Sequence, residues 1–161
     1  MNKVVLKRLG FIFCILAGIV NSSYAQEEIN PVVWSVEIIN ENTDSTRIVA
    51  HANIEDGWHV YSQVISDDPE AMGPMPLEFV FAPSDNYKLI GKPIEKSKMI
   101  THFDKAFEID LNYYENELLV HQSIEILSKT DFVKGSLSYM ACDDEKCIFP
   151  PEFIFEIKIT E

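Results

Sequence analysis

An alternation of apolar and polar side chains with a period of two recurs along the chain after Glu28, and it constrains the fold more than any other feature. Successive side chains of a β-strand point to opposite faces, so this period predicts strands with one buried face. The stripes lie at residues 32–39, 48–54, 77–81, 107–111, 118–126, 133–141 and 153–159. No segment of useful length has the period of an amphipathic helix.

Turn-forming residues separate these stripes. Asparagine, aspartate, proline or glycine occur together at residues 40–44, 56–57 and 83–86, and residues 114–117 predict a tight hairpin connection. Short strands joined by regular turns predict an all-β fold, an immunoglobulin-like antiparallel β-sandwich, with a small barrel as the alternative.

Two stretches interrupt the alternation. Residues 66–76 are rich in proline, and residues 92–105 are charged with a few apolar side chains among the charges. Both are predicted to be loops. Loops on a rigid sandwich often carry function, so these stretches are candidates for a binding or catalytic role.

The N-terminus has the features of a secretory signal peptide. Three basic residues precede an apolar run at residues 9–20, and Ser-Tyr-Ala at residues 23–25 fits a small-residue cleavage site. The apolar run is short for a membrane span, so we expect cleavage before Gln26, with an uncleaved anchor as the alternative. The predicted organisation is a signal peptide at residues 1–25 and one exported domain at residues 26–161.

The charge of the chain narrows the classes of partner. The net charge at pH 7 is −13, and removal of the first 25 residues, which contain three basic and no acidic side chains, makes it −16. So acidic a protein is a poor candidate for binding nucleic acid or anionic membrane surfaces. The remaining sequence contains no second hydrophobic span, so we expect no stable membrane insertion after cleavage. It also contains no glycine-rich phosphate loop and no nucleophile-elbow serine.

A pair of cysteines near the C-terminal end carries the strongest chemical signal. Cleavage of the signal peptide removes Cys14 and leaves Cys142 and Cys147, separated by four residues. An even pair in an exported chain suggests a bridge. A bridge over so short a loop contributes only about 2 kcal/mol in the chain-entropy model, which favours a pair that opens and closes. Spacing alone leaves redox activity and a structural bridge equally open.

A metal site is a third alternative for these cysteines. Cys142, Cys147 and Met140, with His59 or His102, could bind copper, which prefers soft sulfur ligands. The sequence lacks the repeated pair of cysteines two residues apart that marks a structural metal site, so we expect no metal. Of the two histidines, His59 lies between aromatic residues and is expected to be packed, whereas His102 is expected to be exposed.

Three segments together resemble the N-terminal periplasmic domain of the thiol:disulfide interchange protein DsbD family. They are Gly-Trp-His-Val-Tyr-Ser at residues 57–62, Gly-Pro-Met-Pro at residues 73–76, and the cysteine segment at residues 139–151, which ends in two prolines. The resemblance implies an immunoglobulin-like sandwich in the periplasm that exchanges electrons with thioredoxin-like envelope proteins and uses no cofactor beyond its own disulfide. Full-length members continue into a membrane domain and a thioredoxin-like domain.

The resemblance also implies roles for individual residues. Cys142 and Cys147 match the redox pair, and Cys147 matches the cysteine that bonds to the partner's sulfur. The family has a cap loop whose phenylalanine shields the pair, and residues 99–107 match it, with Phe103 the closest match and His102 beside it. The function expected is thiol–disulfide exchange between an envelope reductant and oxidised envelope proteins. The alternative is a non-enzymatic binding module in which the bridge only fixes a loop.

Overall fold

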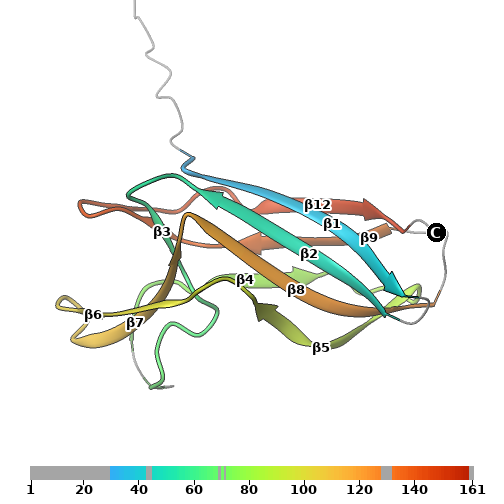
Figure 1. The fold of residues 1–161 in the computed structure, drawn as a ribbon, viewed down its shortest axis with the longest axis horizontal. Helices are drawn as coiled ribbons and strands as arrows, with labels where there is room; N and C mark the ends of the chain where they lie inside the picture. The colour runs from blue at the N-terminus through green and yellow to red at the C-terminus, as the bar shows by residue number, and fades with distance from the viewer. Residues whose placement is uncertain (1–29, 43–44, 69, 71, 128–131, 160–161) are drawn as a thin grey trace, which may run out of the picture.

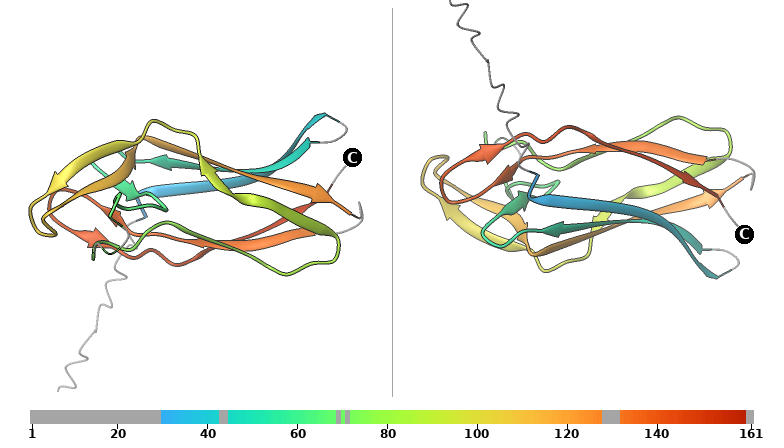
Figure 2. Two further views of the ribbon diagram at one scale, coloured as in Figure 1. Left: turned by 90° about the horizontal axis from the view of Figure 1, so that it is seen from below. Right: turned by 90° about the horizontal axis from the view of Figure 1, so that it is seen from above.

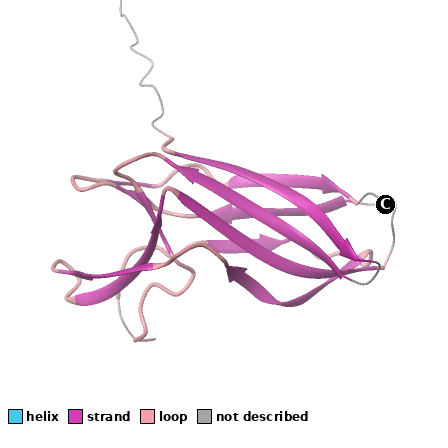
Figure 3. Cartoon of the chain, viewed as in Figure 1, coloured by secondary structure: helices cyan, strands magenta, loops and turns pink. Residues whose placement is uncertain are grey.

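The computed structural model describes residues 30–42, 45–68, 70, 72–127 and 132–159, and the predicted signal peptide with Cys14 lies outside these ranges. The described chain is all-β and contains no helix (Figure 3). Its strands form three sheets (Figure 1). The strands are β1 (Val32–Asn42), β2 (Ser45–Ile54), β3 (His59–Tyr61), β4 (Glu78–Phe81), β5 (Tyr87–Glu95), β6 (Ile100–Asp104), β7 (Ile109–Glu115), β8 (Glu117–Ile126), β9 (Phe132–Ser138), β10 (Ala141–Cys142), β11 (Cys147–Ile148) and β12 (Phe153–Lys158).

Two of the sheets form the body of the molecule. One has the strand order β1-β2-β8-β5 and the other β12-β9-β4, and both run along the long axis of the molecule (Figure 2). Their facing side chains make the main core, where Trp34 of β1, Leu118 of β8 and Leu137 of β9 are buried together. This is the predicted immunoglobulin-like antiparallel sandwich. The described sheets stay open at their edges, so the alternative of a small barrel is wrong.

A third sheet of shorter strands, the end sheet, lies at the end of the sandwich away from the C-terminus (Figure 2). Its strand order is β11-β10-β3-β7-β6. The entry into β3 is the predicted turn at residues 56–57. Gly57 has a φ of 83°, in the left-handed region that favours glycine, and the amide of Trp58 donates a 3.0 Å hydrogen bond to the carbonyl of Glu55.

The carboxylate of Glu95 joins the end sheet to the body. Glu95 ends β5, and its oxygens accept hydrogen bonds from the Ser62 hydroxyl at 2.6 Å, the Gln63 amide at 2.8 Å and the Tyr114 hydroxyl at 3.1 Å. Burial, together with the nearby Glu95 carboxylate, raises the pKa of Tyr114 above its ordinary value. The phenol therefore stays a donor, and it ties β7 to β5.

The prediction that residues 92–105 form a loop is wrong in large part. The stretch contains the end of β5 and all of β6. Both are edge strands, and most of their side chains are exposed on both faces, so they show no apolar stripe. The described residues of the other predicted loop, 66–76, contain no strand, as expected.

Two predictions at the ends of β7 also need correction. The predicted strand at residues 107–111 begins only at Ile109, because Phe107 belongs to a turn that Asp104 closes. The connection after β7 is not a hairpin, since β7 pairs within the end sheet and β8 pairs with β2 and β5. Asn116, with a φ of 64°, takes the chain from one sheet to the other.

Candidate functional site

The two cysteines lie opposite each other on the outermost hairpin of the end sheet. Cys142 of β10 is the direct antiparallel partner of Cys147 of β11, and the structure joins their sulfurs in a disulfide. Neighbouring strands bring directly opposed side chains together on one face of a sheet. The hairpin therefore places the two sulfurs within bonding distance.

The turn that carries the cysteines is closed by its own first residue. The carboxylate of Asp143 accepts hydrogen bonds from the amides of Glu145 and Lys146, both at 2.8 Å, and the amide of Asp143 donates to the carbonyl of Lys146 at 2.9 Å. These backbone hydrogen bonds, that of Glu145 first, lower the pKa of Asp143 below its ordinary value. None of these bonds involves sulfur, so the turn has a reason to persist when the disulfide opens.

The two cysteines differ in their exposure to solvent. Cys142 is only 1% exposed and packs in a cluster with Tyr61, Leu111 and Met140. Cys147 is exposed at the surface of the hairpin. A thiolate from another protein can therefore approach Cys147 more readily than Cys142.

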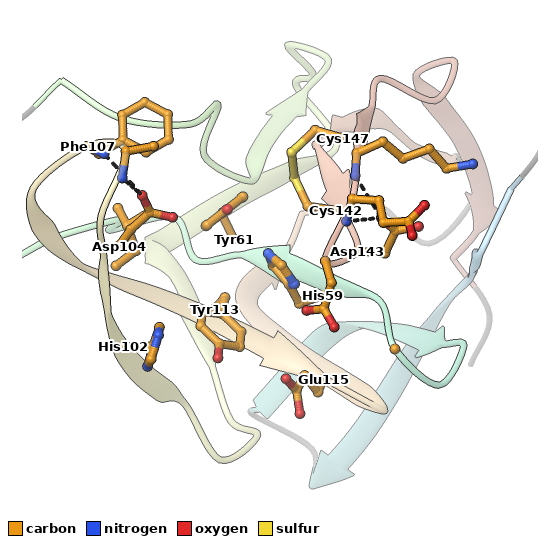
Figure 4. Close-up of a pocket in the computed structure, with 16 residues that line it drawn as sticks. His59, Tyr61, His102, Asp104, Phe107, Tyr113, Glu115, Cys142, Asp143 and Cys147 are labelled. Atoms are coloured by element: carbon orange, nitrogen blue, oxygen red, sulfur yellow. Dashed lines mark hydrogen bonds between the residues drawn. A yellow bond between two sulfur atoms is a disulfide. The ribbon is translucent and has the colours of Figure 1, made fainter.

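The disulfide lies in an open pocket of about 680 Å³ (Figure 4). The pocket is lined by the β10–β11 hairpin, β3, and the hairpin that joins β6 to β7. Acidic side chains predominate along it, and Lys146 is the lysine among the lining residues. The acidic members are Asp104, Glu115, Asp143, Asp144 and Glu145.

The sequence predicted that His59 packs between aromatic residues. The structure confirms this packing and also places His59 beside the disulfide. Its ring contacts those of Tyr61 and Tyr113, with centroid distances of 5.1 and 4.7 Å. Burial lowers the pKa of His59 from its ordinary value, against an opposing effect of nearby carboxylates, of which Glu115 is the largest. Burial also raises the pKa of Tyr61 and of Tyr113.

The structure separates the two residues proposed for the cap. His102 lines the pocket that contains the disulfide, but Phe103 does not. Adjacent side chains of a strand point to opposite faces, and Phe103, which is 52% exposed, borders a shallow hollow with Asp67 and Glu108. The lid role of Phe103 stays a prediction.

Phe107 is the phenylalanine that lines the pocket, and sequence reasoning missed it. Its amide donates a 3.0 Å hydrogen bond to the Asp104 carboxylate, which fixes the turn between β6 and β7. Its side chain is 42% exposed and lies across the pocket from Cys147 (Figure 4). The available signal was Asp104, which can cap a turn two or three residues later.

The copper alternative finds little support in the described chain. The described residues contain no group of three or more histidine, cysteine, aspartate or glutamate side chains placed to hold a metal ion. Met140 is buried beneath the hairpin and is not among the residues that line the pocket. Both cysteine sulfurs are engaged in the disulfide.

A disulfide with one exposed cysteine in an open pocket has the access that thiol–disulfide exchange requires. The family model described as thiol:disulfide interchange protein DsbD, N-terminal, matches residues 30–158. The chain therefore belongs to this family, which confirms the resemblance found in the sequence. No curated protein sequence matches the chain.

Two solved structures match the chain, and the first of them is similar in fold. The N-terminal periplasmic domain of ScsB from Proteus mirabilis has a TM-score of 0.58 and 13% identity, over 83% of this chain and 48% of that one. The chain thus spans about half the length of the ScsB structure. The reduced DsbD N-terminal domain of Neisseria meningitidis has a TM-score of 0.46 and 20% identity, over 78% of this chain and 84% of that one. The described residues include no helix able to cross a membrane.

Proposed function

We propose that the chain is an exported thiol–disulfide exchange domain that passes electrons between an envelope reductant and oxidised envelope proteins through Cys142 and Cys147. The observation that carries the proposal is the unequal exposure of the two cysteines, buried at Cys142 and exposed at Cys147. A bridge that only staples a loop has no need of one accessible sulfur above an open pocket. Family membership and the signal-peptide pattern of residues 1–25 support periplasmic placement.

When a partner reduces the Cys142–Cys147 pair, the first step is attack by a partner thiolate on the Cys147 sulfur. The bond between Cys147 and Cys142 breaks, a mixed disulfide forms, and Cys142 leaves as a thiolate that takes up a proton. The second thiolate of the same partner then attacks the partner's sulfur in the mixed disulfide. This forms the partner's own disulfide and releases Cys147. Two electrons have passed from the partner's dithiol to the pair, and the reverse sequence reduces an oxidised partner.

Thioredoxin-like proteins of the envelope are the proposed partners. They present a reactive sulfur at a protein surface, so the exposed Cys147 can meet it without unfolding either protein. The acidic lining of the pocket favours a partner whose surface around the reactive sulfur is neutral or basic, because like charges raise the free energy of association.

The competing proposal is a binding module whose bridge has a structural role only. The two proposals differ in the reduction potential of the bridge, which we expect to lie above about −300 mV for exchange and below it for a structural bridge. Equilibration of the protein in dithiothreitol or glutathione buffers, followed by alkylation and mass measurement, gives this potential. A bridge that stays closed in those buffers would refute exchange.

A pair of matched serine variants tests which sulfur meets the partner. With Cys142→Ser, the exposed Cys147 has no resolving thiol, so a thioredoxin-like protein lacking its second cysteine should accumulate as a mixed disulfide. Cys147→Ser, the control, leaves only the buried thiol and should trap little. Equal trapping by both variants would overturn the assignment of Cys147, and trapping by neither would overturn the exchange function.

A further inference from the structure

Four chemically active side chains form one row across the end sheet. Cys147 of β11 is opposite Cys142 of β10, Cys142 is opposite His59 of β3, and His59 is opposite Glu115 of β7. Directly opposed residues of neighbouring strands project to the same face, with Cβ atoms about 4.5–5.5 Å apart. All four side chains line the pocket (Figure 4). An imidazole therefore lies between the buried sulfur and a carboxylate.

Packing holds the imidazole of His59 in place. The ring of Tyr61, two residues along β3, meets it edge-on at an interplanar angle of 89°, and the ring of Tyr113 lies against it at 43°. Val60 between them points to the opposite face and is completely buried in the core, which fixes the rotation of the strand. A proton-transfer group needs this kind of fixed orientation to act on one neighbour.

The buried sulfur has a proton-transfer problem that the exposed one does not have. Cys142 must lose a proton before it can attack, yet it is enclosed by apolar and aromatic side chains, and burial disfavours a thiolate. The carboxylates of Asp143 and Asp144, which follow Cys142 in the chain and line the same pocket, also disfavour a negative charge there. His59 is the neighbouring residue on the adjacent strand that can accept the proton.

We propose that His59 accepts the proton of the Cys142 thiol when this cysteine closes the disulfide, and that Glu115 is a positioning residue for the imidazole. The inference deepens the proposed exchange function and rests on it. In the closing step Cys142 gives its proton to a ring nitrogen of His59 and attacks the Cys147 sulfur. The bond from Cys147 to the partner's sulfur breaks, and the partner leaves as a thiolate. Over the full exchange the partner has gained two electrons.

The charge state of His59 at neutral pH suits this role. Desolvation lowers its pKa below the ordinary value of 6.5, so the ring is mostly neutral at pH 7 and free to accept a proton. The charged or titratable groups that face it come from its own strand, from β6 and β7, and from the cysteine turn. They are Tyr61, His102, Asp104, Tyr113, Glu115, Asp143, Asp144, Glu145 and Lys146. The carboxylates raise the pKa of His59, so the imidazolium formed in the step is stabilised.

The test uses the reduced protein and an aromatic disulfide that releases one coloured thiolate at each exchange. The first release reports attack by Cys147 and depends on reagent concentration, whereas the second reports closure by Cys142 and does not. We expect His59→Gln to leave the first phase unchanged and to slow the second by about 10²-fold at pH 7, the lower end of the range for general acid–base catalysis.

The pH dependence of the second phase separates proton transfer from mere packing. In the wild type the closure rate should rise with pH through an inflection below 6.5, because only the neutral ring accepts a proton. Glu115→Gln removes the largest of the effects that raise the pKa of His59, so this inflection should move to lower pH. His51→Gln, which changes a histidine of β2 in the body of the sandwich, away from the pocket, should leave both phases and the inflection unchanged.

The outcomes distinguish this inference from the exchange function beneath it. A wild-type protein that releases no second thiolate would refute exchange itself. A normal second phase in His59→Gln, or an inflection that stays in place in Glu115→Gln, would refute the role of the row while leaving exchange intact. An equal slowing in His51→Gln would also count against His59, since it would indicate a general disturbance of the protein.

Discussion

The body of the sandwich and the end sheet are built on different principles. The body has strands of up to 11 residues whose inner faces are apolar, and its core side chains are buried. The end sheet has strands of two to seven residues, and histidine, tyrosine and carboxylate side chains line its open pocket. The body supplies stability, and the end sheet places reactive groups in register. Stability and reactivity should therefore respond to different substitutions.

The largest expected effect on stability comes from the body. Leu137 of β9 is completely buried between the two long sheets, so Leu137→Ala should lower the free energy of unfolding by about 2–5 kcal/mol through lost burial and a residual cavity. Urea unfolding gives this value. The reduction potential of the Cys142–Cys147 bridge in the folded variant should match the wild type, and a large change would show that the two regions are coupled.

Loss of the bridge should have a smaller effect. The double variant Cys142→Ala, Cys147→Ala removes a constraint on a short loop, which contributes about 2 kcal/mol. The hydrogen bonds of Asp143 also remain available to close the turn. Circular dichroism should show a folded β-protein in the variant. An unfolded variant would favour the structural-staple alternative.

The smallest effect on stability is expected at the aromatic residues of the β6–β7 hairpin, where reactivity should change instead. Phe107 lines the pocket of the disulfide and Phe103 does not, so Phe107→Ala should raise the rate at which the reduced protein reacts with a small thiol reagent more than Phe103→Ala does. Urea unfolding should show little change, because both side chains are about half exposed.

The paired phenylalanine variants serve as controls for each other. A rate increase confined to Phe103→Ala would restore the assignment made from the family's cap loop. Equal rates in the wild type and both variants would remove a lid role from both residues. A loss of about 3–5 kcal/mol in either variant would indicate that the side chain fills a core.

The contrast between the two regions also explains what the sequence could predict. The apolar stripes predict the strands of the body because one face of each strand is buried. The spacing of Cys142 and Cys147 predicts the site. The edge strand β6 carries no stripe, since its pairing comes from backbone hydrogen bonds and not from burial. Its presence decides that Phe103 and His102 point to opposite faces, so the cap could not be assigned from the sequence.

The row of four side chains was beyond sequence reasoning for a related reason. His59, Glu115 and Cys142 come from segments far apart in the chain, and their alignment depends on the register of three strand pairings. A shift of one residue in any pairing would turn a side chain to the other face. Local patterns suggest that His59 is packed between aromatics, but they do not reveal what lies across the neighbouring strand.

The Asp143-closed turn has a consequence for the lifetime of complexes. Since its hydrogen bonds do not depend on the sulfurs, the second thiol stays beside the first at a high effective concentration even while a partner is attached. The Cys142–Cys147 disulfide should then close before a partner that has exchanged only one of its sulfurs can leave by another route. We expect both electrons to be transferred in a single encounter. Mixed disulfides with a partner should be detectable only when one of the two cysteines is removed.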